Sequence, residues 1–385
     1  MWLNKATDSG SNKLIIQKYK MNENVHPEIT VNKAGTFLTE NVSALFFHPD
    51  EKYFLISKKF VARLYNMMYN IDTVFTNYSV IKQERKVIMN KLVVITGPTA
   101  SGKSGLGIDL AKKYNAEIIS ADSRQVFRGL DIGSGKVTPE ETQGIPHYLL
   151  DVAEPNDFFS VMDFQEQAYR HIDEIHGRNG KAFLVGGTGL YVNSVVDGYN
   201  MIKKQIDPET RNEIAAKSLS ELITFLEERN PEVLTKIDLK NKRRVERAVE
   251  RTLLGNTEEP VNTPRYETLV LGTNWPREVL YERIRERLDM RLDMNMIEEV
   301  VKLREHGATD EFLYRLGLEY RYILMYLRDE FESFDAFYDK LFMEIRHLAK
   351  EQMTWFRKRK DIHWLDMTGD PFTEASELID EFYSK

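Results

Sequence analysis

The chain has 385 residues, of which 42% are hydrophobic and 29% charged, and its formal net charge is −7. At roughly 100–200 residues per domain, this length suggests two or three domains of ordinary soluble composition. The absence of cysteine excludes disulfides, thiolate catalysis and cysteine-ligated zinc, which fits a cytoplasmic protein. No apolar run reaches about 18 residues, so we expect no membrane-spanning helix.

Residues 1–88 differ from the rest of the chain, because they are rich in Asn, Tyr, Phe and Lys and contain no chemical motif. Met89 stands directly before the first clear core strand. We interpret Met89 as the native start and residues 1–88 as an extension of unknown role. A small extra domain is the alternative, and a native peptide from before Met89, found by mass spectrometry, would support it.

From residue 92 onward, short apolar runs alternate with helical patterns. Strands are predicted at residues 92–95, 117–121 and 181–185, with a further apolar run at 148–151. This alternation is typical of a mostly parallel sheet covered by helices on both faces. Residues 89–199 therefore form the first part of an α/β core.

Residues 200–264 contain no strand signal and are interpreted as a helical insertion that binds RNA. Pro208 after Asp207 suits the first turn of a helix. The segment 236–252 is basic, with seven Lys or Arg against three acids. A solvated helix face is the simpler interpretation of that charge, and an RNA-binding surface is the alternative.

A strand at residues 268–272 returns the chain to the sheet, and helices are predicted from there to about residue 360. A final strand at 362–365 and a helix at 373–383 complete residues 265–385, the second and mostly helical part of the core. The predicted fold class is α/β, a P-loop NTPase-like parallel sheet flanked by helices with an inserted helical domain.

The loop after the first strand matches the phosphate-binding pattern G-x-x-x-x-G-K-[ST] (the P-loop) at every required position. Its glycines let backbone N–H groups point at phosphate oxygens, and the following helix N-terminus adds partial positive charge. Lys103 is predicted to reach the terminal phosphates and Ser104 to bind Mg²⁺. The pattern predicts a di- or triphosphate ligand but not the reaction. The loop consists of Gly97, Pro98, Thr99, Ala100, Ser101, Gly102, Lys103 and Ser104.

Five further segments narrow the reaction. They are SADSRQVFRGLDIG at 120–133, GGTGLY at 186–191, RRVERA at 243–248, RERLDM at 285–290 and QMTWFR at 352–357. With the loop GPTASGKS before them, in this order, they resemble the tRNA dimethylallyltransferase (tRNA isopentenyltransferase) family over about residues 89–367. A P-loop alone recurs in many families, whereas this ordered set does not.

The resemblance implies transfer of a dimethylallyl group from its diphosphate to N6 of the adenosine at tRNA position 37, beside the anticodon, with release of diphosphate. It makes Asp122 the base or orienting group for the N6 proton, and it makes Thr99 a contact of the reacting groups. Lys103 would stabilise the leaving diphosphate. The expected partners are dimethylallyl diphosphate and the tRNA anticodon loop, with Mg²⁺ as cofactor and a monomer as the active form.

The same resemblance predicts a set of tRNA-contacting residues: Asp122, Ser123, Arg124, Gln125, Thr188, Arg211, Arg243, Arg244, Val245, Glu246 and Arg247. Simpler alternatives stay open for several of them. Asp122 could be a magnesium ligand or a cap, Thr188 could cap a helix, and Arg211 could be a solvated helix residue. The insertion arginines could pair with Glu246 and Glu250.

Asp151 is interpreted as a loop-entry residue, with a magnesium-associated acid as the alternative. Trp355 and Phe356 are expected to pack in the core, without a chemical role.

Two segments depart from the family's pattern. Its usual G-[ST]-[AG]-K-P stretch is GSGKV at 133–137 here, without the proline. Its Ile-Gly-Tyr-Lys-Glu segment is LGLEYR at 316–321 here. Because the latter contacts tRNA in relatives, this departure bears on RNA specificity and not on the P-loop.

Three other functions are compatible with a P-loop. A small-molecule kinase that uses ATP would leave the GGTGLY turn and the insertion's arginines without a role. A prenyltransferase for free adenine nucleotides would not need a basic insertion. A non-catalytic RNA-binding protein would not need both Lys103 and Asp122.

Overall fold

The structure is a computed structural model that describes residues 89–201, 206–255 and 261–385, together with six short strands within residues 1–88. Those strands are β1 (Asn4–Thr7), β2 (Leu14–Gln17), β3 (Thr30–Val31), β4 (Phe37–Leu38), β5 (Leu45–Phe46) and β6 (Phe54–Leu55). The chain divides into two units, Met1–Ile88 and Met89–Lys385. The interpretation of residues 1–88 as an extension concerns mainly residues outside the described ones.

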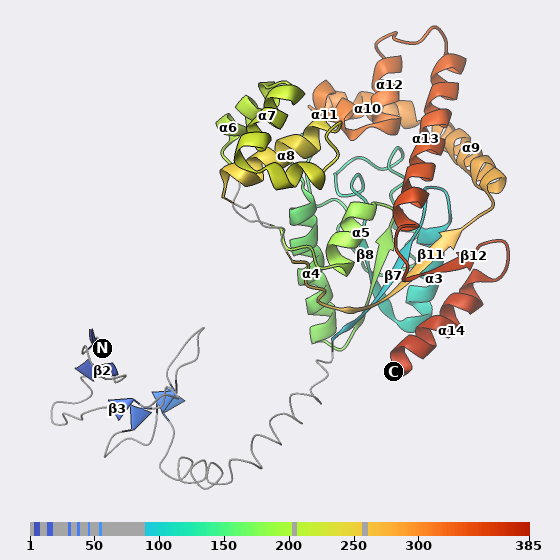
Figure 1. Ribbon diagram of the computed structural model, residues 1–385. Coiled ribbons are helices and arrows are strands. Elements are labelled where there is room, and N and C mark those ends of the chain that lie inside the picture. Colours follow the sequence, from blue (N-terminus) through green and yellow to red (C-terminus); the bar gives the residue numbers. More distant parts are fainter. Residues whose placement is uncertain are drawn as a thin grey trace. The chain divides into compact units, whose positions relative to one another are not determined.

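Six parallel strands form the sheet of the second unit, in the order β12-β11-β7-β10-β8-β9 (Figure 1). Because the strands are parallel, the loops after β7, β8, β10 and β11 meet at one edge, where open parallel sheets bind ligands. The strands are β7 (Lys91–Thr96), β8 (Ala116–Ser120), β9 (His147–Tyr148), β10 (Lys181–Gly186), β11 (Glu267–Asn274) and β12 (Ile362–Asp366).

The sheet confirms the predicted strands at 92–95, 117–121, 181–185, 268–272 and 362–365 to within two residues at each end. The apolar run at 148–151 is different, because β9 ends at Tyr148. Leu149 and Asp151 have φ angles of 64° and 53°, and backbone in this left-handed region cannot continue an extended strand.

Helices cover both faces of the sheet (Figure 1). Leu92 and Val94 of β7 share one hydrophobic cluster with α4 (Val161–Gly177) and α5 (Gly189–Val196). Val93 and Ile95 share another with α3 (Lys103–Tyr114) and α14 (Pro371–Ser384). All four side chains are 0% exposed, as expected for an interior strand of a parallel sheet. The predicted α/β fold class is confirmed.

The described residues of the insertion form helices joined by turns and no strand, and the insertion has a small hydrophobic core of its own. Asp207 caps its first helix through the N–H of Thr210, and Pro208 occupies the first turn, as predicted. Ser218 starts a second helix with a capping box. The elements are α6 (Pro208–Ala216), α7 (Leu219–Arg229), the 3₁₀ turn η1 (Pro231–Thr235) and α8 (Lys242–Leu253).

Five helices follow β11 and share a separate hydrophobic cluster with the segment after β8. Polar contacts join α9 and α13 to the P-loop at the carboxyl edge of the sheet. In the part of the chain that the structure describes, no helix is both long and apolar enough to cross a membrane. These helices are α9 (Arg277–Asp293), α10 (Met296–Glu305), α11 (Asp310–Leu316), α12 (Leu318–Tyr326) and α13 (Phe334–Phe356).

Candidate active site

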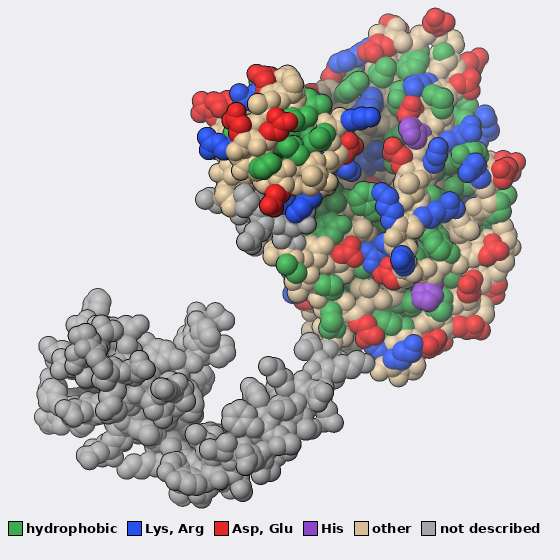
Figure 2. Space-filling model, viewed as in Figure 1, with side chains coloured by type: hydrophobic (Ala, Val, Ile, Leu, Met, Phe, Trp, Pro, Cys, Tyr) green, Lys and Arg blue, Asp and Glu red, His purple; other side chains and the backbone are tan. Residues whose placement is uncertain are grey.

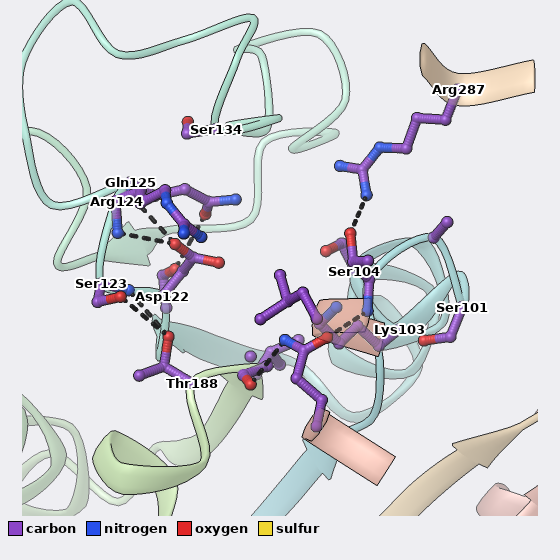
Figure 3. A pocket seen from close by; sticks show the side chains of 18 of the residues that line it. Ser101, Lys103, Ser104, Asp122, Ser123, Arg124, Gln125, Ser134, Thr188 and Arg287 are labelled. Atoms are coloured by element: carbon purple, nitrogen blue, oxygen red, sulfur yellow. Dashed lines mark hydrogen bonds between the residues drawn. The ribbon is translucent and has the colours of Figure 1, made fainter. Parts of the chain in front are cut away.

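A cavity of about 680 Å³ lies at the carboxyl edge of the sheet. The P-loop from Thr99 to Ser104 forms one wall, and residues 122–125 and 186–190 form another (Figure 3). Side chains from α9 and α13 complete the lining. In Figure 2 the surface is hollowed between the insertion and the core, and Lys and Arg side chains gather there. The cavity therefore brings the predicted phosphate site and the predicted base together.

The P-loop owes its shape to its glycines. Gly97 has a φ angle of 151°, and a Cβ atom there would lie 2.0 Å from Oγ1 of Thr273. Gly102 is the left-handed N-cap of α3, a helix without a side-chain cap or an acidic residue in its first turn. The first N–H groups of α3 thus have no acidic side chain beside them and suit an anion. Gly97 and Pro98 do not line the cavity, whereas the other six loop residues do.

Lys103 shares the cavity with a row of arginines for which no role was predicted, although Arg287 lies within the RERLDM segment. Arg283, Arg287 and Arg291 recur every four residues along α9 and therefore lie on one side of it. Arg283 donates to the carbonyl of Ala100 at 3.0 Å, and Arg287 to the hydroxyl of Thr99 at 3.3 Å. This i, i+4, i+8 spacing was visible in the sequence and could have identified the row.

The neighbouring positive charges disfavour one another's protonated forms. Burial, followed by the charge of Arg287, lowers the pKa of Lys103 to about 8. Burial, followed by the charge of Arg291, lowers the pKa of Arg287 to about 10. Buried like charges are unfavourable unless an anion accompanies them, so this wall of the cavity suits a diphosphate.

Asp122 follows β8 and faces the P-loop across the cavity (Figure 3). Its Oδ1 accepts from the backbone N–H groups of Arg124 at 2.9 Å and Gln125 at 3.3 Å, which fixes the carboxylate. No described residue donates a hydrogen bond to Oδ2. Asp122 thus caps its own turn, as one alternative proposed, and keeps a second oxygen for a ligand.

Thr188 begins α5, but its hydroxyl does not cap that helix. Its Oγ1 instead accepts from the N–H of Ser123 at 3.0 Å, which ties the GGTGLY turn to the segment of Asp122. Gln125 bridges Oγ of Ser120 and the carbonyl of Gly135, at 3.1 Å each. Arg124 donates to the carbonyl of Leu316 at 3.1 Å. All four predicted tRNA contacts here line the cavity.

The insertion arginines divide into two kinds. Arg243 and Arg244 are exposed, and no described acidic residue pairs with them. Arg247 pairs with Glu250 at 2.5 Å, as the ion-pair alternative expected, and Arg211, whose alternative was a solvated helix residue, pairs with the same carboxylate at 3.1 Å. Their contacts with tRNA stay a prediction.

Val245 is 0% exposed in the core of the insertion, so the prediction that it contacts tRNA is wrong for its side chain. Its position on the buried side of an amphipathic helix could have warned against including it. Glu246 is half-buried and lies 3.7 Å from Lys242, as an i, i+4 ion pair.

Two residues of α13 belong to the site although no role was predicted for them. Gln352 accepts from the N–H of Thr99 at 2.8 Å and donates to the carbonyl of Gly187 at 2.9 Å. Trp355 lines the cavity and lies so close to Gly189 that a Cβ there would be 2.3 Å from its ring. Trp355 also packs against the hydrophobic cluster of β10 and α5, so the expected core packing is confirmed for it and for Phe356, which is 0% exposed. That neither has a chemical role stays a prediction.

The segment at 316–321 also reaches the cavity. Leu318 lines it with a φ angle of 40°, where the family's pattern has tyrosine. Glu319 forms a buried ion pair with Arg291 at 3.2 Å, with side chains 7% and 9% exposed. This chain thus presents a smaller, apolar side chain at that point of the wall.

The oxygen atoms that line the cavity suit a magnesium ion that is held mainly by phosphate oxygens of a bound substrate. Ser104 lines the cavity, and the described residues contain no group of three His, Cys, Asp or Glu that could hold a metal alone. Mg²⁺ commonly takes one or two protein oxygens together with phosphate oxygens and water, and Ser104 fits that role. Asp151 instead pairs with Lys136 at 2.5 Å and does not line the cavity.

A P-loop on an interior strand, buried cations beside it and a fixed carboxylate opposite define a protein that binds a phosphorylated substrate next to a potential base. The profile of the family described as IPP transferase matches residues 125–359. The tRNA dimethylallyltransferase 1 of Geotalea uraniireducens (strain Rf4) is 40% identical over 292 residues, which cover 75% of this chain and 96% of the relative. The chain therefore belongs to the IPP transferase family.

Solved structures agree with that assignment. The full-length tRNA isopentenylpyrophosphate transferase from Bacillus halodurans matches with a TM-score of 0.59 and 37% identity, over 76% of this chain and 96% of that one. A eukaryotic dimethylallyltransferase described as acting on tRNA matches with a TM-score of 0.67 over 77% of this chain and 80% of that one. At 23% identity, the latter likeness supports the fold alone.

Proposed function

We propose that this protein transfers a dimethylallyl group from dimethylallyl diphosphate to N6 of the adenosine at tRNA position 37 and releases diphosphate. The observation that carries the proposal is one cavity with Lys103, Arg287 and the P-loop on one wall and Asp122 on the opposite one. Relatives and solved structures that bear the corresponding names, at 37–40% identity, support it.

The diphosphate would lie against the P-loop amides. Lys103 and Arg287 would stabilise the negative charge that grows as the bond between carbon and oxygen breaks. Thr99, held on its N–H by Gln352 and on its hydroxyl by Arg287, would sit beside the bridging oxygen. Mg²⁺ at Ser104 would supply further charge to the diphosphate when bound.

Asp122 would act on the acceptor. The adenine N6 attacks the first carbon of the dimethylallyl group while the diphosphate leaves with the electrons of the carbon–oxygen bond. Oδ2 of Asp122 then accepts a proton from N6, and Oδ1 stays bound to two backbone N–H groups. The base must leave the stack of the anticodon loop to reach this cavity.

The insertion would hold the RNA backbone. Arg243 and Arg244 have exposed guanidinium groups that are free to contact phosphates. One chain supplies the whole described lining of the cavity, so we expect a monomer to be active.

A transfer assay tests the proposal. Purified protein, Mg²⁺ and radiolabelled dimethylallyl diphosphate are incubated with unmodified tRNA, with AMP or with ATP. Label in tRNA alone, mapped to the adenosine beside the anticodon, is the expected result. Label in AMP alone would assign the protein to the nucleotide prenyltransferases, and consumption of ATP without label would favour a kinase.

Replacement of Lys103 tests the same proposal through a loss of transfer activity. The variant Lys103→Ala removes a cation from the diphosphate wall and should reduce transfer by about a hundredfold or more. Lys112→Ala, an exposed change on the same helix, is the control. Unchanged transfer by Lys103→Ala would remove the P-loop from the mechanism.

A further inference from the structure

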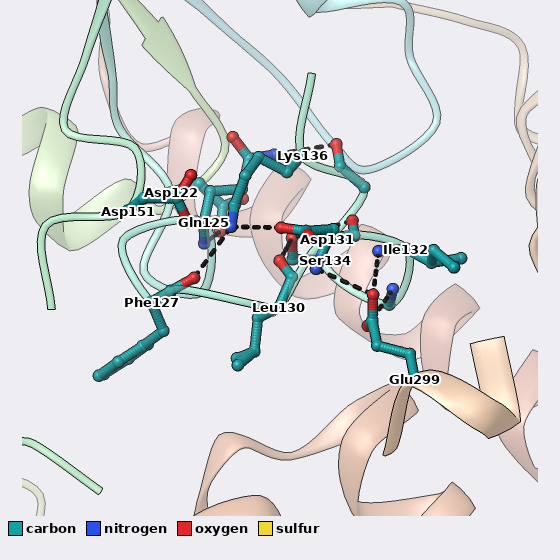
Figure 4. Close-up of polar contacts among 12 residues, drawn as sticks. Asp122, Gln125, Phe127, Leu130, Asp131, Ile132, Ser134, Lys136, Asp151 and Glu299 are labelled. Carbon is teal, nitrogen blue, oxygen red and sulfur yellow. Dashed lines mark hydrogen bonds and ion pairs between the residues drawn. The ribbon is translucent and has the colours of Figure 1, made fainter. Parts of the chain in front are cut away.

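The GSGKV segment contains a lysine that does not face the phosphate site. The side chain of Lys136 is 6% exposed and lies behind the cavity wall, not among its lining residues (Figure 4). Its Nζ donates to the carbonyl of Phe127 at 2.9 Å and pairs with Asp131 at 2.6 Å and Asp151 at 2.5 Å. These three contacts engage all three protons of the ammonium group, so it is not available to a phosphate.

A carboxylate from another helix holds the same segment from the other side. Glu299 of α10 accepts from three consecutive backbone N–H groups, those of Asp131, Ile132 and Gly133, at 3.0, 2.6 and 3.0 Å (Figure 4). The hydroxyl of Tyr320 also donates to it at 3.0 Å. Consecutive N–H groups in this arrangement form an anion-binding concavity, here occupied by the protein's own carboxylate.

The loop held in this way touches the working parts of the site. The carbonyl of Gly133 accepts from Arg291 at 3.3 Å, and the carbonyl of Gly135 accepts from Gln125 at 3.1 Å. Gly135 has a φ angle of 63°, and a Cβ there would lie 1.7 Å from Arg291 and 2.2 Å from Arg287. The loop is therefore packed directly on the two arginines and on the residue whose N–H binds Asp122.

We propose that Lys136 and Glu299 are positioning residues, which clamp the Asp131–Lys136 loop so that Arg287, Arg291 and Gln125 keep their places around the reacting groups. The proposal rests on the proposed transfer reaction and deepens it. Neither residue lines the cavity, so each acts through the loop. A displacement of about 1 Å at a reacting centre can cost a hundredfold in rate, which is the scale on which such a clamp acts.

The first test replaces Glu299 by Gln, which points an N–H₂ group at N–H donors while keeping the side chain's size. We expect kcat for transfer to tRNA to fall by about tenfold or more. Binding of dimethylallyl diphosphate and of inorganic pyrophosphate should weaken by a smaller factor than kcat, since Lys103 and the P-loop amides are untouched and only the contribution of the displaced Arg287 is lost. The matched control is Glu298→Gln, an exposed neighbour on α10, which should behave as wild type.

The second test is Lys136→Met, with the exposed Lys302→Met as control. A clamp predicts the same loss of kcat, with a smaller loss of pyrophosphate affinity. If Lys136→Met instead weakens pyrophosphate binding while kcat stays normal, Lys136 is a phosphate ligand and the proposal is wrong. Normal kcat in both Lys136→Met and Glu299→Gln would also overturn it.

Hydrogen exchange separates this proposal from the proposed function. Peptides that cover residues 122–136 should exchange faster in Glu299→Gln than in wild type, while those covering 97–104 should not change. If the wild-type protein transfers nothing to tRNA, the reaction is wrong, yet this difference would still establish the clamp. Equal exchange in both proteins would refute the clamp whatever the activity.

Discussion

Lys103 lies in an environment very different from that of a free lysine side chain. Its ammonium group is desolvated beside Arg287 and Arg291, and only Asp122 among its named neighbours favours the charged form. Such a group is poised to bind an anion, because a diphosphate would replace the lost hydration and neutralise the repulsion. The burial that lowers its pKa is therefore also what adapts it to its ligand.

The pH dependence follows from that pKa of about 8. Below about pH 8 Lys103 is protonated in the free protein and attracts the diphosphate, whereas above it the charge is lost. We expect kcat/KM for dimethylallyl diphosphate to fall as the pH rises through about 8, and kcat to be less affected, because bound diphosphate stabilises the protonated form. In Lys103→Arg this limb of the profile should disappear, and its persistence would assign the titration to another group.

Asp122 gives a second prediction at this scale. Asp122→Asn keeps an oxygen that can accept from the N–H groups of Arg124 and Gln125, so the turn should survive. It removes the proton acceptor, and kcat should fall by about 10²–10⁴-fold with pyrophosphate affinity unchanged. Quenched transfer assays would measure kcat, and calorimetric titration would measure pyrophosphate affinity. Asp109→Asn on α3 is an exposed control. Full activity in Asp122→Asn would exclude it as the base.

The role of a single residue could be predicted only where a sequence motif also defined the residues around it in the site. Lys103 and Asp122 lie beyond the carboxyl ends of β7 and β8, so the fold class alone placed them at the same edge. Arg287 lies nearly two hundred residues from the P-loop, and the spacing of the α9 arginines marks one side of that helix without showing that this side faces the loop. The prediction that the Val245 side chain contacts tRNA was wrong because a motif match does not show which side of a helix is buried.

Among the elements, α13 was predicted as a helix, but its role as part of the cavity was not. Gln352 joins the P-loop to the GGTGLY turn by one accepted and one donated bond. Glycine at 187 permits this approach, since a Cβ there would lie 2.8 Å from Nε2 of Gln352. Such contacts depend on how a distant helix packs over the sheet, which periodicity does not reveal.

Removal of that bridge should weaken both stability and catalysis. In Gln352→Met the N–H of Thr99 and the carbonyl of Gly187 lose their partners, which should lower the free energy of unfolding by about 1–3 kcal/mol. With Thr99 released, kcat should fall by about tenfold or more. Urea denaturation and the transfer assay would measure the two effects, and Thr354→Val, exposed on the same helix, is the control. A stability loss with normal kcat would make Gln352 a purely structural bridge.

At the scale of the whole molecule, an acidic chain is expected to bind a polyanion. The net charge of −7 is compatible with this because the cations are gathered locally. Lys and Arg side chains line the hollow between insertion and core (Figure 2), and the insertion's basic helix adds Arg243 and Arg244. The sequence pattern predicted the insertion, but only the structure separates its free arginines from those held by Glu250.

The difference between the unpaired arginines and those paired with Glu250 predicts how RNA binding responds to salt. A cationic side chain that binds a phosphate releases counterions, so removing one such side chain changes the slope of log affinity against log salt by about 0.7–0.9. Arg243→Ala combined with Arg244→Ala should reduce the slope for tRNA by about 1.4 to 1.8 and leave pyrophosphate affinity unchanged. Arg247→Ala should reduce it less, because its guanidinium already pairs with Glu250. Filter-binding titrations at several salt concentrations would measure the slopes. A reduction of about 0.7–0.9 in Arg247→Ala, the value for one free cation, would show that its ion pair opens on RNA binding. No change of slope in the double variant would place the RNA on another surface.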